Sequence, residues 1–300
     1  MNVISANRFL LVMLLLVLTA QIIAAPFGEA GQCLATFSAI VFLGALFPDT
    51  VGNFLQDSRF KTPPRLKTAI AFTALDLTVT FGLVYFWVTI AALYFPAYLE
   101  QLEAGNLDVQ AGTIDQLFLF ITGAIFVPFY EEFVFRGVVL RAYERARSPI
   151  YAALLTSVLF ALVHGTLIQL LAFIPGSFLM ARVVQNRGSW WLVVIPHAIY
   201  NGLIFGLFPF LPPETEEEPQ LMGGFIALLI ASIAFAIAAR WLNIFARQEP
   251  KATFPRNEQI WTPALISVVW FGLSVIILTT FFTIDPESIS RWGHFLAAHL

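Results

Sequence analysis

The stretch TAIAFTALDLTVTFGLVYFWVTIAALYF, residues 68–95, is apolar along its whole length apart from a few hydroxyls and one carboxylate, Asp76. Because about 20 apolar residues suffice to cross a bilayer as a helix, it predicts a transmembrane helix. Runs of the same kind follow and precede it, at 9–25, 32–48, 117–136, 150–171, 172–186, 189–210, 222–246 and 261–284. The expected fold is an all-α, polytopic transmembrane helical bundle of eight to nine spans. The run at 9–25 also resembles a signal peptide, so its place in the mature chain stays open.

Composition excludes whole classes of protein. Apolar residues make up 59% of the chain and charged residues only 12%, whereas a soluble domain carries about 25% charged residues. The net charge of −3 and the lack of a basic face exclude nucleic-acid binding. The single cysteine, Cys33, excludes an internal disulfide framework and a cysteine-based zinc site. The lipid bilayer is the expected environment.

Basic residues are distributed very unevenly between the expected connections. Of the 16 Lys and Arg, 15 fall at one side in a strict alternation, namely Arg8, Arg59, Lys61, Arg65, Lys67, Arg136, Arg141, Arg145, Arg147, Arg182, Arg187, Arg240, Arg247, Lys251 and Arg256. By the positive-inside rule these connections are cytoplasmic, as in a multi-pass protein of a bacterial plasma membrane. Trp190, Trp191 and Trp261 lie at expected span ends, where they would anchor the helices at the interface.

Few ionisable residues lie within the expected spans, and each is a candidate for function because burying a charge in a bilayer is costly. They are Asp76, Glu131, Glu132, His164 and His197, with Asn201 one turn beyond the last. Asp76 is a candidate lining residue of a cavity, and a polar contact to a neighbouring helix explains it equally well. His294 and His299 lie in the C-terminal tail without such neighbours.

The segment YEEFVFRG, residues 130–137, holds two adjacent carboxylates and one cation. Residues four apart share a helix face, so Glu132 is expected to pair with Arg136 while Glu131 points about 100° away. This predicts Glu132 as the structural partner of Arg136 and Glu131 as the working base. The alternative is a helix-end ion pair with one spare carboxylate.

The two histidines each have a useful neighbour four residues away. His197 and Asn201 share one helical stripe after Pro196. His164 follows Phe160, whose ring can pack the imidazole and exclude water. One or two carboxylates, two histidines and a carboxamide therefore converge from three helices.

These groups suffice for two chemistries, and both predict hydrolysis of a peptide bond. In the first, Glu131 and one histidine deprotonate a water while the other histidine and Asn201 stabilise the oxyanion. In the second, His164, His197 and Glu131 bind one zinc ion, which lowers the pKa of its water. The sequence leaves metal-dependent and metal-free mechanisms equally open.

The segments EEFVFR at 131–136, FALVH at 160–164 and HAIYN at 197–201 resemble, in this order, the EExxxR, FxxxH and HxxxN motifs of the CPBP family of intramembrane proteases. That family includes the CAAX prenyl proteases of the Rce1 type and bacteriocin-processing or immunity homologues. The resemblance covers about 117–210. It implies a helical intramembrane endopeptidase, with Glu131, Glu132, His164, His197 and Asn201 as catalytic residues and Arg136 as the motif arginine.

The expected organisation is a single membrane domain, 1–300, with a CPBP-like catalytic core at 117–210 and flanking transmembrane helices at 1–116 and 211–300. The expected partner is a peptide or membrane-protein substrate. A non-catalytic scaffold or immunity factor using the same pocket is the alternative function. An ion or proton transporter is disfavoured because no internal repeat is evident.

His164 is expected at a different depth in the membrane from the other candidate residues. At 1.5 Å per residue, Glu131, His197 and Asp76 lie roughly 8–12 Å from their expected cytoplasmic boundaries, whereas His164 lies about 21 Å from residue 150. We therefore expect the fifth helix to begin one or two turns outside the membrane.

Overall fold

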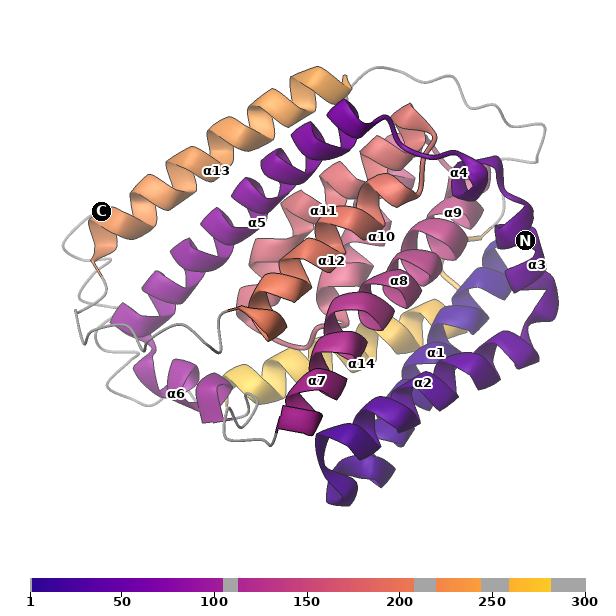
Figure 1. Cartoon of the computed structure of the whole chain (residues 1–300), viewed down its shortest axis with the longest axis horizontal. Coiled ribbons are helices and arrows are strands. Elements are labelled where there is room, and N and C mark those ends of the chain that lie inside the picture. The colour runs from indigo at the N-terminus through magenta and orange to yellow at the C-terminus, as the bar shows by residue number, and fades with distance from the viewer. Residues whose placement is uncertain (1, 105–112, 208–219, 244–258, 282–300) are drawn as a thin grey trace.

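The structure is a computed structural model that describes residues 2–104, 113–207, 220–243 and 259–281. These residues form helices without a strand among them, arranged in one bundle (Figure 1). The helices are α1 (Val3–Ala24), α2 (Gly28–Leu46), α3 (Pro48–Gln56), α4 (Ser58–Lys61), α5 (Leu66–Tyr94), α6 (Pro96–Ala104), α7 (Thr113–Ile121), α8 (Val127–Glu132), α9 (Leu140–Ala146), α10 (Pro149–Leu162), α11 (Leu167–Arg187), α12 (Trp191–Gly206), α13 (Leu221–Leu242) and α14 (Pro263–Phe281). The all-α expectation is confirmed.

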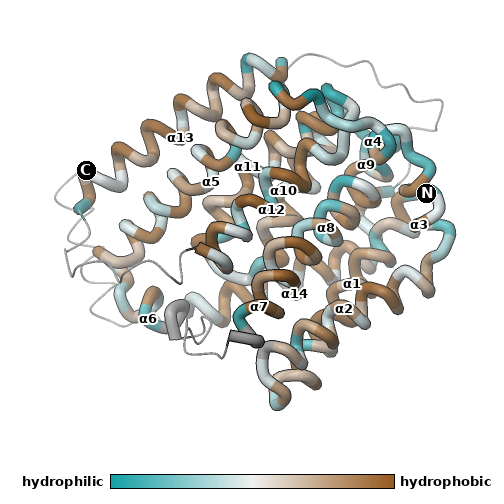
Figure 2. Tube along the Cα trace, viewed as in Figure 1, coloured by the Kyte–Doolittle hydropathy of each residue, from teal (hydrophilic) through white to brown (hydrophobic). Residues whose placement is uncertain are grey.

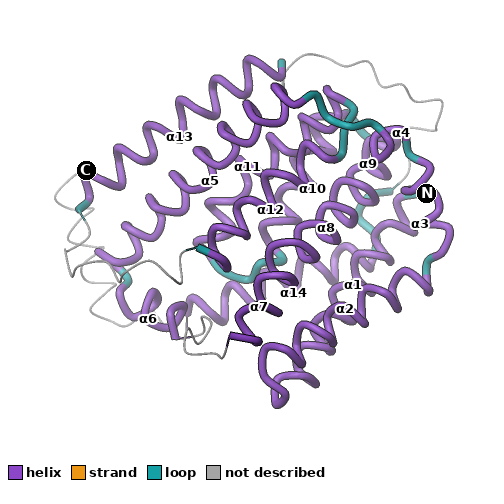
Figure 3. Tube along the Cα trace, in the orientation of Figure 1, coloured by secondary structure: helices purple, strands orange, loops and turns teal. Residues whose placement is uncertain are grey.

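In the described part of the chain, six helices are long and apolar enough to cross a membrane, or seven if the bent pair α2 and α3 is counted as one span. Two shorter apolar helices, α10 and α12, lie inside the bundle as well (Figure 3). The expected eight or nine spans are reached only when these two are counted. The described part of every expected apolar run is mainly helical, although the run at 150–171 covers α10 and the first turn of α11.

Helices at the outside of the bundle consist mostly of apolar residues, as Figure 2 shows for α13. On α13, Leu229, Ile233 and Ile237 are each more than half exposed, at 60%, 52% and 53%. Apolar surface on this scale is costly in water but not in hydrocarbon. The protein is therefore a multi-pass membrane protein.

α1 is packed into the bundle through its first half. Asn7 is fully buried, and its amide donates to the Ile260 carbonyl (2.8 Å) and to Thr262 Oγ1 (2.9 Å). It also accepts from the Tyr143 hydroxyl at 2.7 Å. These bonds join the first turns of α1 to α9 and to the residues just before α14.

Hydrophilic segments gather at the end of the bundle that holds the N-terminus, α4 and α9 (Figure 2). Arg59 pairs with Glu144 at 3.2 Å, and Arg141 pairs with Asp57 at 2.8 Å. The Arg59 carbonyl also accepts from the backbone N–H of Trp190 at 3.0 Å. Three basic connections thus lie at the same end, as their alternation along the sequence predicted.

Two expected helix boundaries are wrong. The helix expected to end at residue 136 continues through Ala146, because Arg136 is buried instead of marking the membrane surface. The break expected after residue 171 lies at 163–166 instead, so α11 is a full-length helix. Gly165, with φ +77°, reverses the chain there, and Thr166 caps α11 by accepting from the Gln169 N–H at 3.1 Å.

Candidate active site

The helix that carries the two glutamates has π-helical turns on both sides of α8, at Thr122–Phe126 (η2) and Phe133–Val139 (η3). In η2 the Val127 N–H donates to the carbonyl of Thr122, five residues back. With the same five-residue spacing, the Gly123 carbonyl would accept a hydrogen bond from the N–H of residue 128. Residue 128 is proline, which has no N–H. The Asn201 amide donates to that carbonyl at 2.8 Å. Pro128 thus leaves the Gly123 carbonyl without a backbone donor, and the side chain of Asn201 on α12 donates to it instead.

Glu132 and Arg136 form a buried ion pair. Arg136 Nη1 lies 3.1 Å from Glu132 Oε1, and both side chains are fully buried. Arg136 Nη2 donates to Ser177 on α11, at 2.7 Å to Oγ and 3.2 Å to the carbonyl. The guanidinium also lies 4.5 Å from the centre of the Phe160 ring. The pairing expected from the four-residue spacing is present, deep inside the bundle instead of at a helix end.

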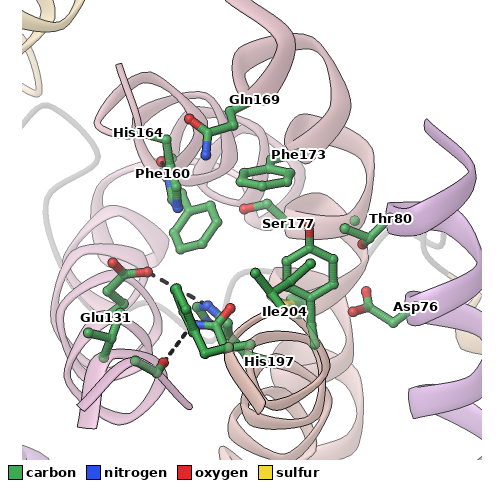
Figure 4. A pocket seen from close by; sticks show the side chains of 17 residues that line it. Asp76, Thr80, Glu131, Phe160, His164, Gln169, Phe173, Ser177, His197 and Ile204 are labelled. Atoms are coloured by element: carbon green, nitrogen blue, oxygen red, sulfur yellow. Dashed lines mark hydrogen bonds and ion pairs between the residues drawn. The ribbon is translucent and has the colours of Figure 1, made fainter. Parts of the chain in front are cut away.

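His197 lies between Glu131 and Glu132, and Figure 4 shows its contact with Glu131. Its Nδ1 is 2.9 Å from Glu132 Oε1, and its Nε2 is 3.8 Å from Glu131 Oε2. Because a carboxylate can only accept, Nδ1 carries a proton in this contact. Arg136, Glu132, His197 and Glu131 therefore form one chain of charges and hydrogen bonds that ends at Glu131.

His164 lies in the turn after α10. Its Nδ1 is 2.7 Å from the Phe160 carbonyl, which can only accept, so in the neutral ring Nε2 is the unprotonated nitrogen. The Phe160 ring is 4.7 Å from the imidazole, and the Phe173 ring lies against it at 5.0 Å. The expected packing of Phe160 on His164 is thus confirmed.

The corrected boundary removes the difference in depth between Glu131 and His164. Counted from Ala146, where the continuous helix ends, Glu131 lies about 22 Å in, and His164 lies the same distance from the start of α10 at Pro149. Counted from the starts of α12 and α5, His197 and Asp76 lie about 9 Å and about 15 Å in, so the residue count does not place all four at one depth. That the fifth helix begins outside the membrane stays a prediction.

Most of the predicted site residues line one cavity of about 290 Å³. Its lining includes Asp76, Glu131, Phe160, His164, His197 and Asn201, which come from four separate helices and one turn (Figure 4). Glu132 and Arg136 lie behind this lining and reach it through His197. Gln169, Phe173, Ser177, Tyr200 and Thr80 also line it and were not predicted.

Trp190 contacts the site in a way that the sequence did not predict. It was expected to anchor the helix at the interface, yet it is only 1% exposed. Its indole N–H donates to the carbonyl of Glu132 at 3.1 Å. The tryptophan therefore supports the helix turn that holds Glu132. A π-helical register, which frees carbonyls, leaves no clear signal in a sequence.

His164, His197 and Glu131 are the ligands expected for a zinc ion. Within the described residues, no group of three or more His, Cys, Asp or Glu side chains is arranged so that it could hold a metal ion. In this arrangement His164, His197 and Glu131 do not form the three-ligand site that a zinc ion would need.

Comparisons with known proteins show similarity over part of the chain. Residues 113–203 match the family model described as type II CAAX prenyl endopeptidase Rce1-like. The chain is also similar to a Bacillus subtilis protein named "Putative membrane peptidase YdiL", with 27% identity over 111 residues, which cover 35% of this chain and 46% of that protein. The matched part is thus about half the length of that relative. No solved structure matches. The resemblance predicted from the three motifs is confirmed for residues 113–203, which match the Rce1-like family of membrane proteases.

Proposed function

We propose that this protein is an intramembrane endopeptidase that hydrolyses a peptide bond with a water activated by Glu131. The observation that carries the proposal is the chain Arg136–Glu132–His197–Glu131, which ends at a carboxylate in the cavity lining. Oε2 of Glu131 makes no hydrogen bond to any described residue and is free to accept a proton from water. A cavity of about 290 Å³ has room for several waters, each of which occupies about 30 Å³ in the liquid.

In the proposed step, Glu131 takes one proton from the water as its oxygen bonds to the carbonyl carbon of the substrate. The C–N bond then breaks, and the proton passes from Glu131 to the leaving nitrogen, which gives a carboxylic acid and an amine. His197 is held by Glu132 through Nδ1, so a protonated ring can donate from Nε2 on the Glu131 side. Arg136 offsets the charge of Glu132, which lets Glu132 act as an acceptor without competing for the proton.

The oxyanion that forms needs hydrogen-bond donors. Asn201 uses one amide hydrogen on the Gly123 carbonyl, which fixes the orientation of its side chain, and has a second to offer. Neutral His164 instead presents an acceptor, Nε2, which suits the binding of the attacking water. The two histidines thus have different roles in this mechanism because different groups hold their Nδ1 atoms.

The substrate is proposed to be a peptide or the membrane-proximal part of a membrane protein, with the basic end of the bundle facing the cytoplasm. A comparison of protein termini in membranes from cells that carry wild type or Glu131→Gln tests the activity without a prior guess at the substrate. An uncleaved species that accumulates with Glu131→Gln supports proteolysis and identifies the substrate.

Glu144→Gln is the matched control, because Glu144 lies on the same continuous helix but pairs with Arg59 and Arg141 away from the cavity. Its terminal profile should equal that of wild type. Identical profiles for all three proteins at equal expression would contradict the proposal and favour a scaffold.

A further inference from the structure

Asp76 lies outside the region that matches the protease family, in the first half of α5, yet it lines the same cavity as the candidate catalytic residues. It is only 1% exposed. Figure 4 shows Asp76 and Thr80 across the cavity from Glu131, on a helix of their own. The wall opposite the base thus holds a second carboxylate that the proposed mechanism does not use.

The Asp76 carboxylate has no hydrogen-bond or ion-pair partner among the described residues, although the charge of Arg136 acts on it at longer range. Its Oδ1 is buried and makes no hydrogen bond to any described residue, and no Lys, Arg or His in the described part of the chain pairs with it. The buried cation Arg136 directs Nη1 to Glu132 and Nη2 to Ser177. A buried polar group without a partner is costly, so a partner supplied from the cavity would be strongly favoured.

Asp76 lines the cavity beside a glycine. Across from it on α11 is Gly176, where a Cβ atom would lie 2.8 Å from Thr80 Oγ1 and 3.7 Å from Asp76 Oδ1. Any side chain at 176 would therefore press on Thr80 and cover part of Asp76. Glycine keeps the carboxylate and the hydroxyl uncovered, so that both can contact a bound group.

The charges in the cavity favour a cation as that group. Arg136 offsets Glu132, which leaves Glu131 and Asp76 as carboxylates without a Lys or Arg partner among the described residues. Between them the walls are largely apolar, with Phe173 and Ile204 in the lining. Lysine and arginine combine an apolar stem with a charged end and match this arrangement. Hydrogen bonds in which one partner is charged are roughly twice as strong as neutral ones.

We propose that Asp76, with Thr80 beside it, is a specificity-determining residue that binds the side chain of a lysine or arginine next to the peptide bond that is cut. This inference rests on the proposed proteolysis and adds the substrate class to it. The selected substrate is a peptide with a basic residue close to the cleavage site, and a norleucine or acidic residue at that position is disfavoured.

The test uses the full-length protein in proteoliposomes and pairs of peptides that differ only in lysine or norleucine at each position around the cleaved bond. At one position, wild type should cut the lysine peptide about 10- to 100-fold faster in kcat/KM, the effect of one charge-assisted hydrogen bond. In Asp76→Asn this ratio should fall towards one. Thr78→Val is the matched control, because Thr78 is two residues along the same helix and bonds to the Ala74 carbonyl instead of lining the cavity; its ratio should equal that of wild type.

A wild-type ratio near one at every position, or an unchanged ratio in Asp76→Asn, would overturn the inference. Acetylation of the peptide's lysine is a second measurement that needs no variant: it should remove the same advantage on wild type, and an acetylated peptide cut equally well would also overturn it. If wild type cuts none of the peptides, their binding to it is measured instead. A preference for lysine that Asp76→Asn loses would then support the site although the proposed proteolysis had failed, and equal binding would overturn it.

Discussion

Replacement of Arg136 by methionine should destabilise the protein more than any other single change at the site. Methionine keeps an apolar stem of similar length but leaves the fully buried Glu132 without its cation, 3.1 Å away in the wild type. Breaking a buried ion pair from one side costs about 3–5 kcal/mol of the free energy of unfolding. The loss of the two contacts to Ser177 adds to this.

Two further variants show whether charge is the cause. Arg136→Lys keeps the cation but not the planar fork, so it should cost only about 1–3 kcal/mol, the penalty of leaving buried acceptors unmet. Arg136→Met combined with Glu132→Gln removes both charges and should be more stable than Arg136→Met alone, because replacing both members of a buried pair is often close to neutral.

Equilibrium unfolding in mixed micelles, followed by tryptophan fluorescence, measures all four proteins under one condition. If Arg136→Met lies within about 1 kcal/mol of wild type, a threshold well below the expected cost, the ion pair does not hold Glu132 as described. A double variant no more stable than Arg136→Met would equally contradict the role of charge.

Two smaller predictions concern the backbone around the site. Asn201→Leu leaves the Gly123 carbonyl without its donor and should cost about 1–3 kcal/mol of unfolding free energy; the cost should shrink when Pro128→Ala restores an N–H, and a cost unchanged in that background would refute the link. Gly165→Ala should cost at least about 1–2 kcal/mol, because φ is +77° and a Cβ would meet a neighbouring side chain at 3.1 Å. Gly188→Ala, at φ +66° in open space, should be milder; equal melting temperatures for both variants would count against the packing argument.

Much of the fold could be predicted because a bilayer demands long apolar helices, and the apolar runs in the sequence are mainly helical where the structure describes them. A helix boundary is predicted wrongly where a charged residue lies inside the bundle instead of at the membrane surface. Arg136 looks like a helix end in the sequence but is neutralised inside the bundle by Glu132. The break at Gly165 could have been found, since a glycine followed by Thr166 is a typical end of one helix and start of the next.

Within the site, spacing along one helix predicted the pairing of Glu132 with Arg136 and of Phe160 with His164. Spacing cannot predict contacts between helices, because it shows which residues share a helix face but not which neighbouring helix that face contacts. The contact of Trp190 with the Glu132 carbonyl is of that kind. The sequence could not place Asp76 opposite Glu131 for the same reason.

The most direct measurement is the single-turnover cleavage rate of the identified substrate by purified wild type, Glu131→Gln and Glu144→Gln in proteoliposomes. The mechanism predicts that Glu131→Gln is slower by about 10²- to 10⁴-fold, the usual contribution of a general base, while it binds the substrate and unfolds as wild type does. Glu144→Gln should cleave at the wild-type rate. Cleavage by Glu131→Gln at that same rate would contradict the central claim that Glu131 activates the water.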